Sequence, residues 1–166
     1  MTSSPEITYL EMRSADEICP KSNNDDRFTV RECPVKQWQL NRFFYHQIGK
    51  TWAWNDKSSW SDAQWLEYVE GENIRTFVAY YDGVPAGYFE LNQKNVREIE
   101  IAYFGLLSEY CGRGFGGVLL TEALIEAWSL QPSRVWVHTC TADHAAALPN
   151  YKSRGMKVYL VVPNEV

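Results

Sequence analysis

The sequence EIEIAYFGLLSEYCGRGFGGVLLTEALIEAW, residues 98–128, changes from a strand pattern to a helix pattern across a glycine-rich turn. Residues alternate over 98–102, so Glu98 and Glu100 share the face opposite two isoleucines, as in a half-buried strand. Over 118–128 the apolar residues recur at helical spacing, and polar residues fall on the opposite side. The stretch therefore predicts a strand with two carboxylates on one face, then a turn and an amphipathic helix.

The turn has the composition of an anion-binding site. Glycines lack a Cβ atom and let backbone N–H groups approach a ligand closely. The N-terminus of the following helix adds unpaired N–H donors and the positive end of the helix dipole. A phosphate or pyrophosphate is therefore the natural ligand. The turn consists of Gly112, Arg113, Gly114, Phe115, Gly116 and Gly117.

Two other phosphate-binding motifs compete for this turn. Gly112, Gly114 and Gly117 satisfy the G-x-G-x-x-G spacing of dinucleotide-binding folds, but no acidic residue follows about 20 positions on, around residues 134–137. A P-loop requires Lys and then Ser or Thr after its last glycine, whereas Val118 stands here. A glycine-rich connection without a ligand is the remaining alternative.

A third motif, R/Q-x-x-G-x-G/A after a strand that carries a carboxylate, fits better. Residues 114–116 fill G-x-G, and in this the sequence resembles the GCN5-related N-acetyltransferase (GNAT) family, whose members bind acetyl-CoA with this turn. Cys111 stands where the family usually has Arg or Gln, and Arg113 could supply the missing positive charge. Because backbone N–H groups make most of the family's pyrophosphate contacts, the substitution leaves the site in place.

A second segment carries the same resemblance. DHAAALPNYKSRGM, residues 143–156, is similar to the family's alanine-rich helix followed by a tyrosine, three residues, a glycine and an apolar residue. Tyr151 and Gly155 match this spacing, while Met156 replaces the more usual Phe. The resemblance covers residues 75–160 well and the N-terminal third only in its general layout.

The resemblance implies an α/β (α+β) fold and one domain over residues 1–166. Its sheet is mixed and mostly antiparallel, with six to seven strands, flanking helices and a splayed parallel pair at the cofactor cleft. The residue patterns themselves predict strands at 6–12, 28–31, 76–81, 86–91, 98–102, 134–140 and 158–162, and helices at 34–49, 61–71, 118–128 and 144–154. Pro149 should kink the last helix or mark its effective start.

Gly105 lies near the end of the strand that carries the two carboxylates, and it predicts a β-bulge. Such a bulge would leave backbone groups of Leu106 and Leu107 free for a ligand. The resemblance implies that these groups bind the pantetheine arm of CoA and that residues 112–117 bind its pyrophosphate.

Composition limits the partners. The chain has 166 residues, 45% of them hydrophobic, which suffices for one core. Its net charge is −5 without a cluster of Lys or Arg, which argues against nucleic acids and anionic membranes. No signal sequence or apolar span is evident, so a cytoplasmic protein is expected; a homodimer is left open. The four cysteines lack metal-site or disulfide spacing, so no metal is expected.

Direct acetyl transfer to an amine needs a base and an acid. The resemblance implies that Glu100 is the base and that Tyr151 donates a proton to the departing thiolate. Glu98 lies about 7 Å away on the same face, and two such carboxylates would raise one pKa. A solvated strand face with ordinary acids is the alternative. His138, on a later strand, ranks behind Glu100 as a base and is placed on the acceptor side.

Trp52, Trp54 and Trp60 form an aromatic-dense connection before the hairpin. Core packing is the simpler explanation, because aromatic rings bury large areas. A wall of the acceptor pocket is the alternative, since ring faces attract an ammonium group.

The resemblance thus implies an N-acetyltransferase that transfers an acetyl group from acetyl-CoA to a primary amine of a small molecule or protein. A non-catalytic acyl-CoA-binding or regulatory module on the same fold is the main alternative. A nucleotide-binding domain is a weaker one.

Overall fold

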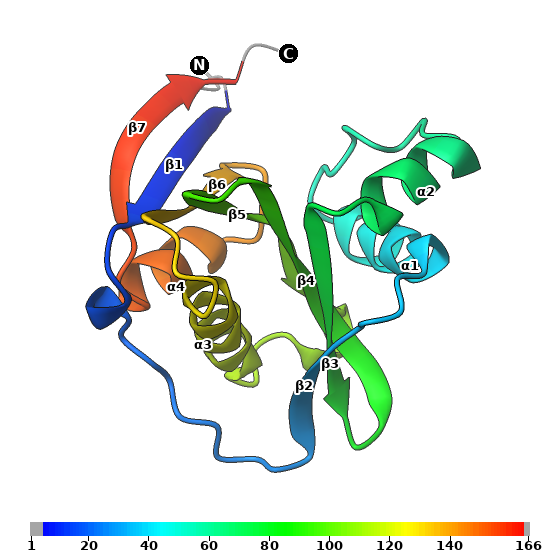
Figure 1. Ribbon diagram of the computed structural model, residues 1–166. Helices are drawn as coiled ribbons and strands as arrows, with labels where there is room; N and C mark the ends of the chain where they lie inside the picture. The colour runs from blue at the N-terminus through cyan, green and yellow to red at the C-terminus, as the bar shows by residue number, and fades with distance from the viewer. Residues whose placement is uncertain (1–4, 165–166) are drawn as a thin grey trace.

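In the computed structural model, which describes residues 5–164, seven strands form one sheet in the order β2-β3-β4-β5-β6-β1-β7 (Figure 1). The strands are β1 (Glu6–Met12), β2 (Phe28–Glu32), β3 (Ile74–Tyr81), β4 (Val84–Asn95), β5 (Glu98–Leu106), β6 (Arg134–Cys140) and β7 (Lys157–Pro163). The α-helices are α1 (Trp38–Gly49), α2 (Asp62–Glu70), α3 (Phe115–Trp128) and α4 (Ala147–Ser153). Short 3₁₀ turns cover Ala15–Glu17 and Ser108–Tyr110.

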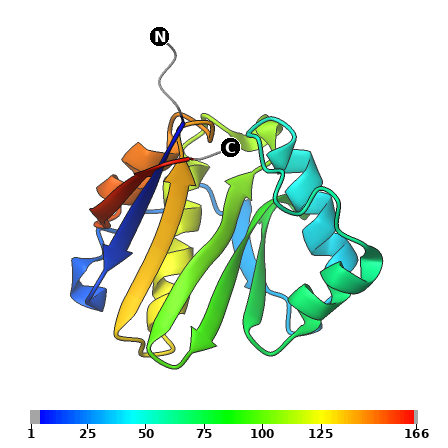
Figure 2. The same ribbon diagram turned by 90° about the horizontal axis from the view of Figure 1, so that it is seen from above.

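Neighbouring strands run antiparallel except β5 and β6, which are parallel and joined through α3. Their pairing starts at Glu98 opposite Arg134 and stops at Glu100 opposite Trp136. Beyond that point the two strands separate. The mixed, mostly antiparallel sheet and its splayed parallel pair are therefore as predicted. Figure 2 shows β1 and β7 at the edge of the sheet farthest from α1 and α2.

Helices cover both faces of the sheet, with α3 and α4 on one side and α1 and α2 on the other (Figure 1). Alternate residues of the hairpin explain this arrangement. Phe77 and Phe89 join the core that contains the apolar face of α3. Val78 and Tyr88 instead pack with Phe44 of α1. The hairpin is thus buried on both faces.

Local signals set the helix limits. Ser61 and Gln64 form a capping box at the start of α2. The first helix begins at Trp38 rather than at Pro34. The last begins at Ala147, so Pro149 falls in its first turn, where its missing N–H breaks no helical hydrogen bond.

The bulge expected at Gly105 is elsewhere. The register shifts where Glu90 pairs with Tyr103 and Leu91 with Ile101, whereas Gly105 pairs regularly with Tyr88. A Cβ atom on Gly105 would lie 2.8 Å from the side chain of Ile48, so close packing of α1 explains this glycine. The predicted freedom of Leu107 is also wrong for its N–H group, which donates to the Ala86 carbonyl at 2.8 Å.

Candidate active site

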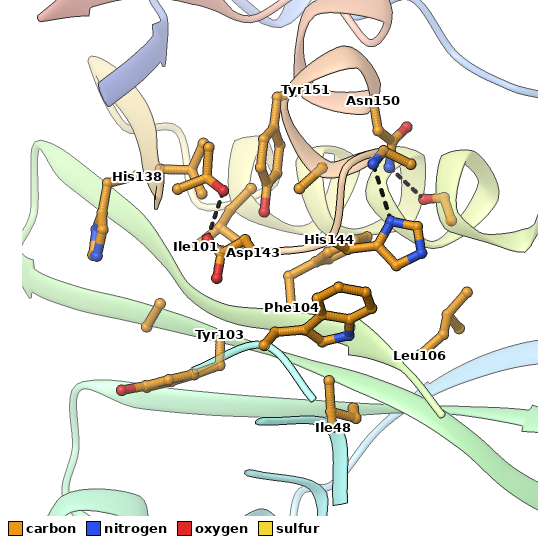
Figure 3. Close-up of a pocket in the computed structure, with 18 of the residues that line it drawn as sticks. Ile48, Ile101, Tyr103, Phe104, Leu106, His138, Asp143, His144, Asn150 and Tyr151 are labelled. Atoms are coloured by element: carbon orange, nitrogen blue, oxygen red, sulfur yellow. Dashed lines mark hydrogen bonds between the residues drawn. The ribbon is translucent and has the colours of Figure 1, made fainter. Parts of the chain in front are cut away.

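A cleft of about 1100 Å³ opens where β5 and β6 separate. It is lined by β5 from Glu100 to Leu106, by the glycine turn before α3, by residues around the start of α4, and by the connection after α1. Figure 3 shows these elements around one pocket, with Tyr151 and Asn150 reaching in from α4 and Tyr103, Phe104 and Leu106 from β5. The glycine turn, β5 and α4 therefore meet as three walls of one site.

The glycine turn fits a phosphate ester. Gly114 adopts a left-handed conformation (φ 86°) directly before α3, and no side chain of the described residues caps the helix. A Cβ atom on Gly117 would lie 2.6 Å from Cδ of Lys21 and 2.8 Å from a guanidinium nitrogen of Arg154. Uncapped N–H groups, a turn with four glycines among its six residues and two nearby cations suit a diphosphate.

Not every predicted cofactor residue faces the cleft. Leu106 lines it, together with Gly112, Gly114, Gly116 and Gly117. The Arg113 guanidinium lies 4.6 Å from the ring centre of Tyr81 instead. Phe115 is 5% exposed and stacks on Phe28 at 4.4 Å, so its side chain belongs to the core. Arg113 and Phe115 therefore lie outside the cleft lining.

The two carboxylates of β5 have different surroundings. Glu100 lines the cleft, its side chain is 14% exposed, and its Oε1 lies 3.7 Å from Nδ1 of His138 on β6. Burial raises the pKa of Glu100, and His138 opposes this shift only in part. Glu98 instead pairs with Arg134 at 3.1 Å and lies outside the cleft lining. Burial, not its carboxylate neighbour, therefore perturbs Glu100.

Tyr151 is 6% exposed and lines the cleft from α4. Burial, together with the nearby Asp143 carboxylate, raises the pKa of its phenol. Asp143 is held in place because its Oδ2 accepts hydrogen bonds from the Thr139 hydroxyl at 2.6 Å and the Cys140 N–H at 2.8 Å. The Tyr151 hydroxyl therefore keeps its proton at neutral pH.

The tryptophans do not form one wall. Trp52 lines the cleft, and its ring centre lies 4.7 Å from that of His144. Trp54 also lines the cleft but packs against Gly49, Gly105 and Tyr103. Trp60 lies outside the cleft lining and packs on Trp65 and Tyr68.

Residues 35–156 match the model of the acetyltransferase (GNAT) family. The chain belongs to the GNAT family. Its fold resembles a GCN5-related N-acetyltransferase from Sphaerobacter thermophilus, with a TM-score of 0.71 and 16% identity over 96% of this chain and 50% of that one. A GCN5-related N-acetyltransferase from Kribbella flavida has a TM-score of 0.64 and 16% identity over 93% of this chain and 56% of that one. A tandem GNAT protein from the clavulanic acid biosynthesis pathway has a TM-score of 0.64 and 16% identity over 95% of this chain and 51% of that one.

This GNAT chain spans only about half the length of these solved structures, and at such identities the likeness concerns the fold alone. The curated proteins include no match to its sequence. Within residues 5–164, no helix combines the length and apolar character needed to cross a membrane.

The GNAT cleft also contains polar residues that sequence reasoning missed. Asp56 accepts hydrogen bonds from the hydroxyls of Tyr45, at 3.1 Å, and Tyr103. Lys57 donates to the same carboxylate at 3.2 Å, and its ammonium lies 4.3 Å from the ring centre of Trp60. Asp56 and Lys57 lie between the tryptophans in the sequence, but nothing local predicts that the Lys57 ammonium packs among the rings of Trp60, Tyr68 and Tyr103.

Proposed function

We propose that this GNAT protein is an N-acetyltransferase that moves an acetyl group from acetyl-CoA to a primary amine of a small molecule or protein. The supporting observation is that Glu100 and Tyr151 line one cleft together with the glycine turn. Acetyl-CoA, when bound, supplies an acetyl group activated as a thioester. The turn residues and Leu106 of β5 would hold it, as the family's use of this cleft implies.

Glu100 is the proposed base. A primary amine is largely an ammonium ion at neutral pH and must lose a proton before it can attack. Because burial raises its pKa, the Glu100 carboxylate binds a proton more strongly than an exposed glutamate does. It accepts the proton directly or through a water molecule. Glu98 is a weaker candidate, since Arg134 already neutralises it.

Tyr151 is the proposed acid. Its raised pKa keeps a proton on Oη, ready for a thiolate leaving group with a pKa of about 8 to 9. Asp143 is fixed by two hydrogen bonds and favours the neutral phenol. The phenol thus keeps its proton until the thiolate departs, as an acid in this step must.

The acceptor end of the cleft suits a cation. Glu100 lines it together with the rings of Trp52, Trp54 and Tyr103, whereas Asp56 is already paired with Lys57. A ring face is worth about 0.5 to 2 kcal/mol to an ammonium group, and the Glu100 carboxylate adds to this. Primary amines should therefore be preferred over alcohols of the same shape.

Thiol release from acetyl-CoA, measured with a panel of primary amines and the corresponding alcohols, tests the proposal. Release that depends on the amine, with a mass increase of one acetyl group on the acceptor, is expected. Acetyl-CoA binding without release for any amine would instead support the non-catalytic module. We also propose a single domain and a cytoplasmic location, which limited proteolysis and cell fractionation would test.

A further inference from the structure

Lys21 crosses the glycine turn. It lies on the connection between β1 and β2, and its Nζ donates to the Gly114 carbonyl at 2.9 Å. Its backbone N–H donates to the Thr121 hydroxyl at 2.9 Å, and this hydroxyl donates to the Gly117 carbonyl at 2.7 Å. The connection is therefore fixed to the first turns of α3, with one ammonium group over the turn.

Arg154 approaches the same turn from the end of α4. One of its terminal nitrogens lies 2.8 Å from the position of a Cβ on Gly117. That nitrogen and Nε are buried, and neither has a hydrogen-bond partner among the described residues. A buried N–H group without a partner is costly, so these donors require an acceptor. The Arg154 carbonyl also accepts from the Cys19 N–H at 2.9 Å, which ties both cations to one connection.

The charge of these two cations is not balanced by a carboxylate in the part of the chain that the structure describes. Within residues 5–164, neither Lys21 nor Arg154 has a carboxylate oxygen within 4.0 Å. The chain as a whole has a net charge of −5, so two such cations beside a positive helix terminus stand out. An anion between them would satisfy the buried donors and remove the repulsion.

We infer that Lys21 and Arg154 form a phosphate subsite that binds the diphosphate of CoA through their side chains. The inference rests on the proposed use of acetyl-CoA. Cys111 carries no positive charge, and the Arg113 guanidinium lies against the ring of Tyr81. The inference therefore assigns the positive charge expected at the turn to two residues that are far apart in the sequence. It also explains Gly117, because any larger residue would displace both cations. The 3′-phosphate of CoA has the same chemistry and is the other possible source.

Titration calorimetry tests this with Lys21→Met, which keeps the aliphatic chain, and with Arg154→Gln. Lys152→Gln is the matched control, since Lys152 is an exposed cation of the same helix. The ligands are CoA, dephospho-CoA, which lacks the 3′-phosphate, and pantetheine, which lacks every phosphate. Thermal unfolding checks that each variant is folded. If Arg154→Gln does not fold, the comparison of Lys21→Met with the wild type carries the test.

Each charge removal should weaken the binding of CoA and dephospho-CoA about tenfold or more, with pantetheine and the control unchanged. A loss seen with CoA but not with dephospho-CoA would assign the subsite to the 3′-phosphate. Unchanged CoA affinity in both variants would overturn the subsite and leave the proposed function standing. Failure of the wild-type protein to bind CoA would overturn both.

Discussion

Nδ1 of His138 lies 3.7 Å from Oε1 of Glu100, across the point where β5 and β6 separate. The pair joins the last paired residue of β5 to a residue two positions beyond the last paired residue of β6. Burial raises the pKa of Glu100, and a positive charge on His138 lowers it. The state of this carboxylate is therefore set by desolvation, which raises its pKa, against the charges of His138, Lys94 and Lys57, which lower it.

Glu100→Gln should lower kcat/KM about 10²- to 10⁴-fold and flatten the acidic limb of its pH profile. The base must be ionised, and burial places its pKa above the ordinary 4.5, so activity should rise with pH through that shifted value. His138→Gln is the matched variant. Because it removes a charge that lowers this pKa, the acidic limb should move to higher pH. An acidic limb that persists in Glu100→Gln would pass the base role to another group.

Tyr151→Phe should reduce kcat by a similar factor of about 10²–10⁴ while CoA affinity stays the same. The hydroxyl makes no hydrogen bond with any other residue of the described chain, so the free energy of unfolding should hardly change. Single-turnover rates and denaturant unfolding measure the two effects. Wild-type rates under conditions where chemistry limits turnover would remove Tyr151 from the mechanism.

Gly116→Val should weaken acetyl-CoA binding without unfolding the protein. An added Cβ would meet only Nδ2 of Asn150, at an ordinary 3.6 Å, so the core tolerates the change. The methyl groups would instead obstruct the turn where a ligand must approach the backbone. Calorimetry with CoA, after thermal unfolding has confirmed the fold, is the measurement. Unchanged affinity would show that the cofactor does not use this turn.

Local patterns sufficed for the strand, the turn and α3. The alternation around Glu100 and the glycines after Cys111 need no information from the rest of the chain. The direction of the Arg113 side chain could not be predicted locally, because Tyr81, which it contacts, lies on a strand distant in the sequence. Lys21 and Arg154 were missed for the same reason, because a lone cation in a polar loop has no sequence signal until the fold brings it to the turn.

The bulge predicted at Gly105 was wrong because two different structural causes place a glycine in a strand. A glycine in a strand marks either a bulge or the close approach of another element. Only the position of Ile48 on α1 shows that close approach applies here. The aromatic connection is a similar case, since Trp52 and Trp54 look alike in the sequence and differ only in what packs against them.

Trp52→Ala and Trp54→Ala should therefore have different effects. Trp54 packs on Gly49 so closely that a Cβ atom added to Gly49 would lie 2.5 Å from the Cβ atom of Trp54. Loss of the Trp54 side chain should therefore lower the free energy of unfolding by about 3 kcal/mol. Trp52 contacts His144 across the cleft, so its removal should mainly raise the acceptor KM. Urea unfolding and steady-state kinetics separate the two. Equal loss of stability in both variants, with acceptor KM unchanged, would make the whole segment core packing.

Glu90 should control part of the pH dependence of folding. It is 1% exposed and accepts hydrogen bonds from Asn41 and Tyr68, each at 2.8 Å. Burial raises its pKa in the folded state, against an ordinary 4.5 when unfolded. Between these two pKa values the folded protein binds more protons, so the free energy of unfolding should fall as pH rises, with a slope of at most about 1.4 kcal/mol per pH unit. Glu90→Gln cannot ionise and should lose this fall.

Glu32→Gln provides the control of opposite sign. Hydrogen bonds from Arg75 lower the pKa of Glu32, so its contribution is present above pH 4.5 and is lost as pH falls. Urea unfolding of both variants and the wild type between about pH 4 and 8 gives the two differences. As pH rises, the free energy of unfolding of Glu90→Gln should increase relative to that of the wild type. The free energy of unfolding of Glu32→Gln should instead decrease relative to that of the wild type. Parallel curves for Glu90→Gln and wild type would mean that Glu90 stays ionised throughout, with Lys57 and the two hydrogen bonds outweighing its burial.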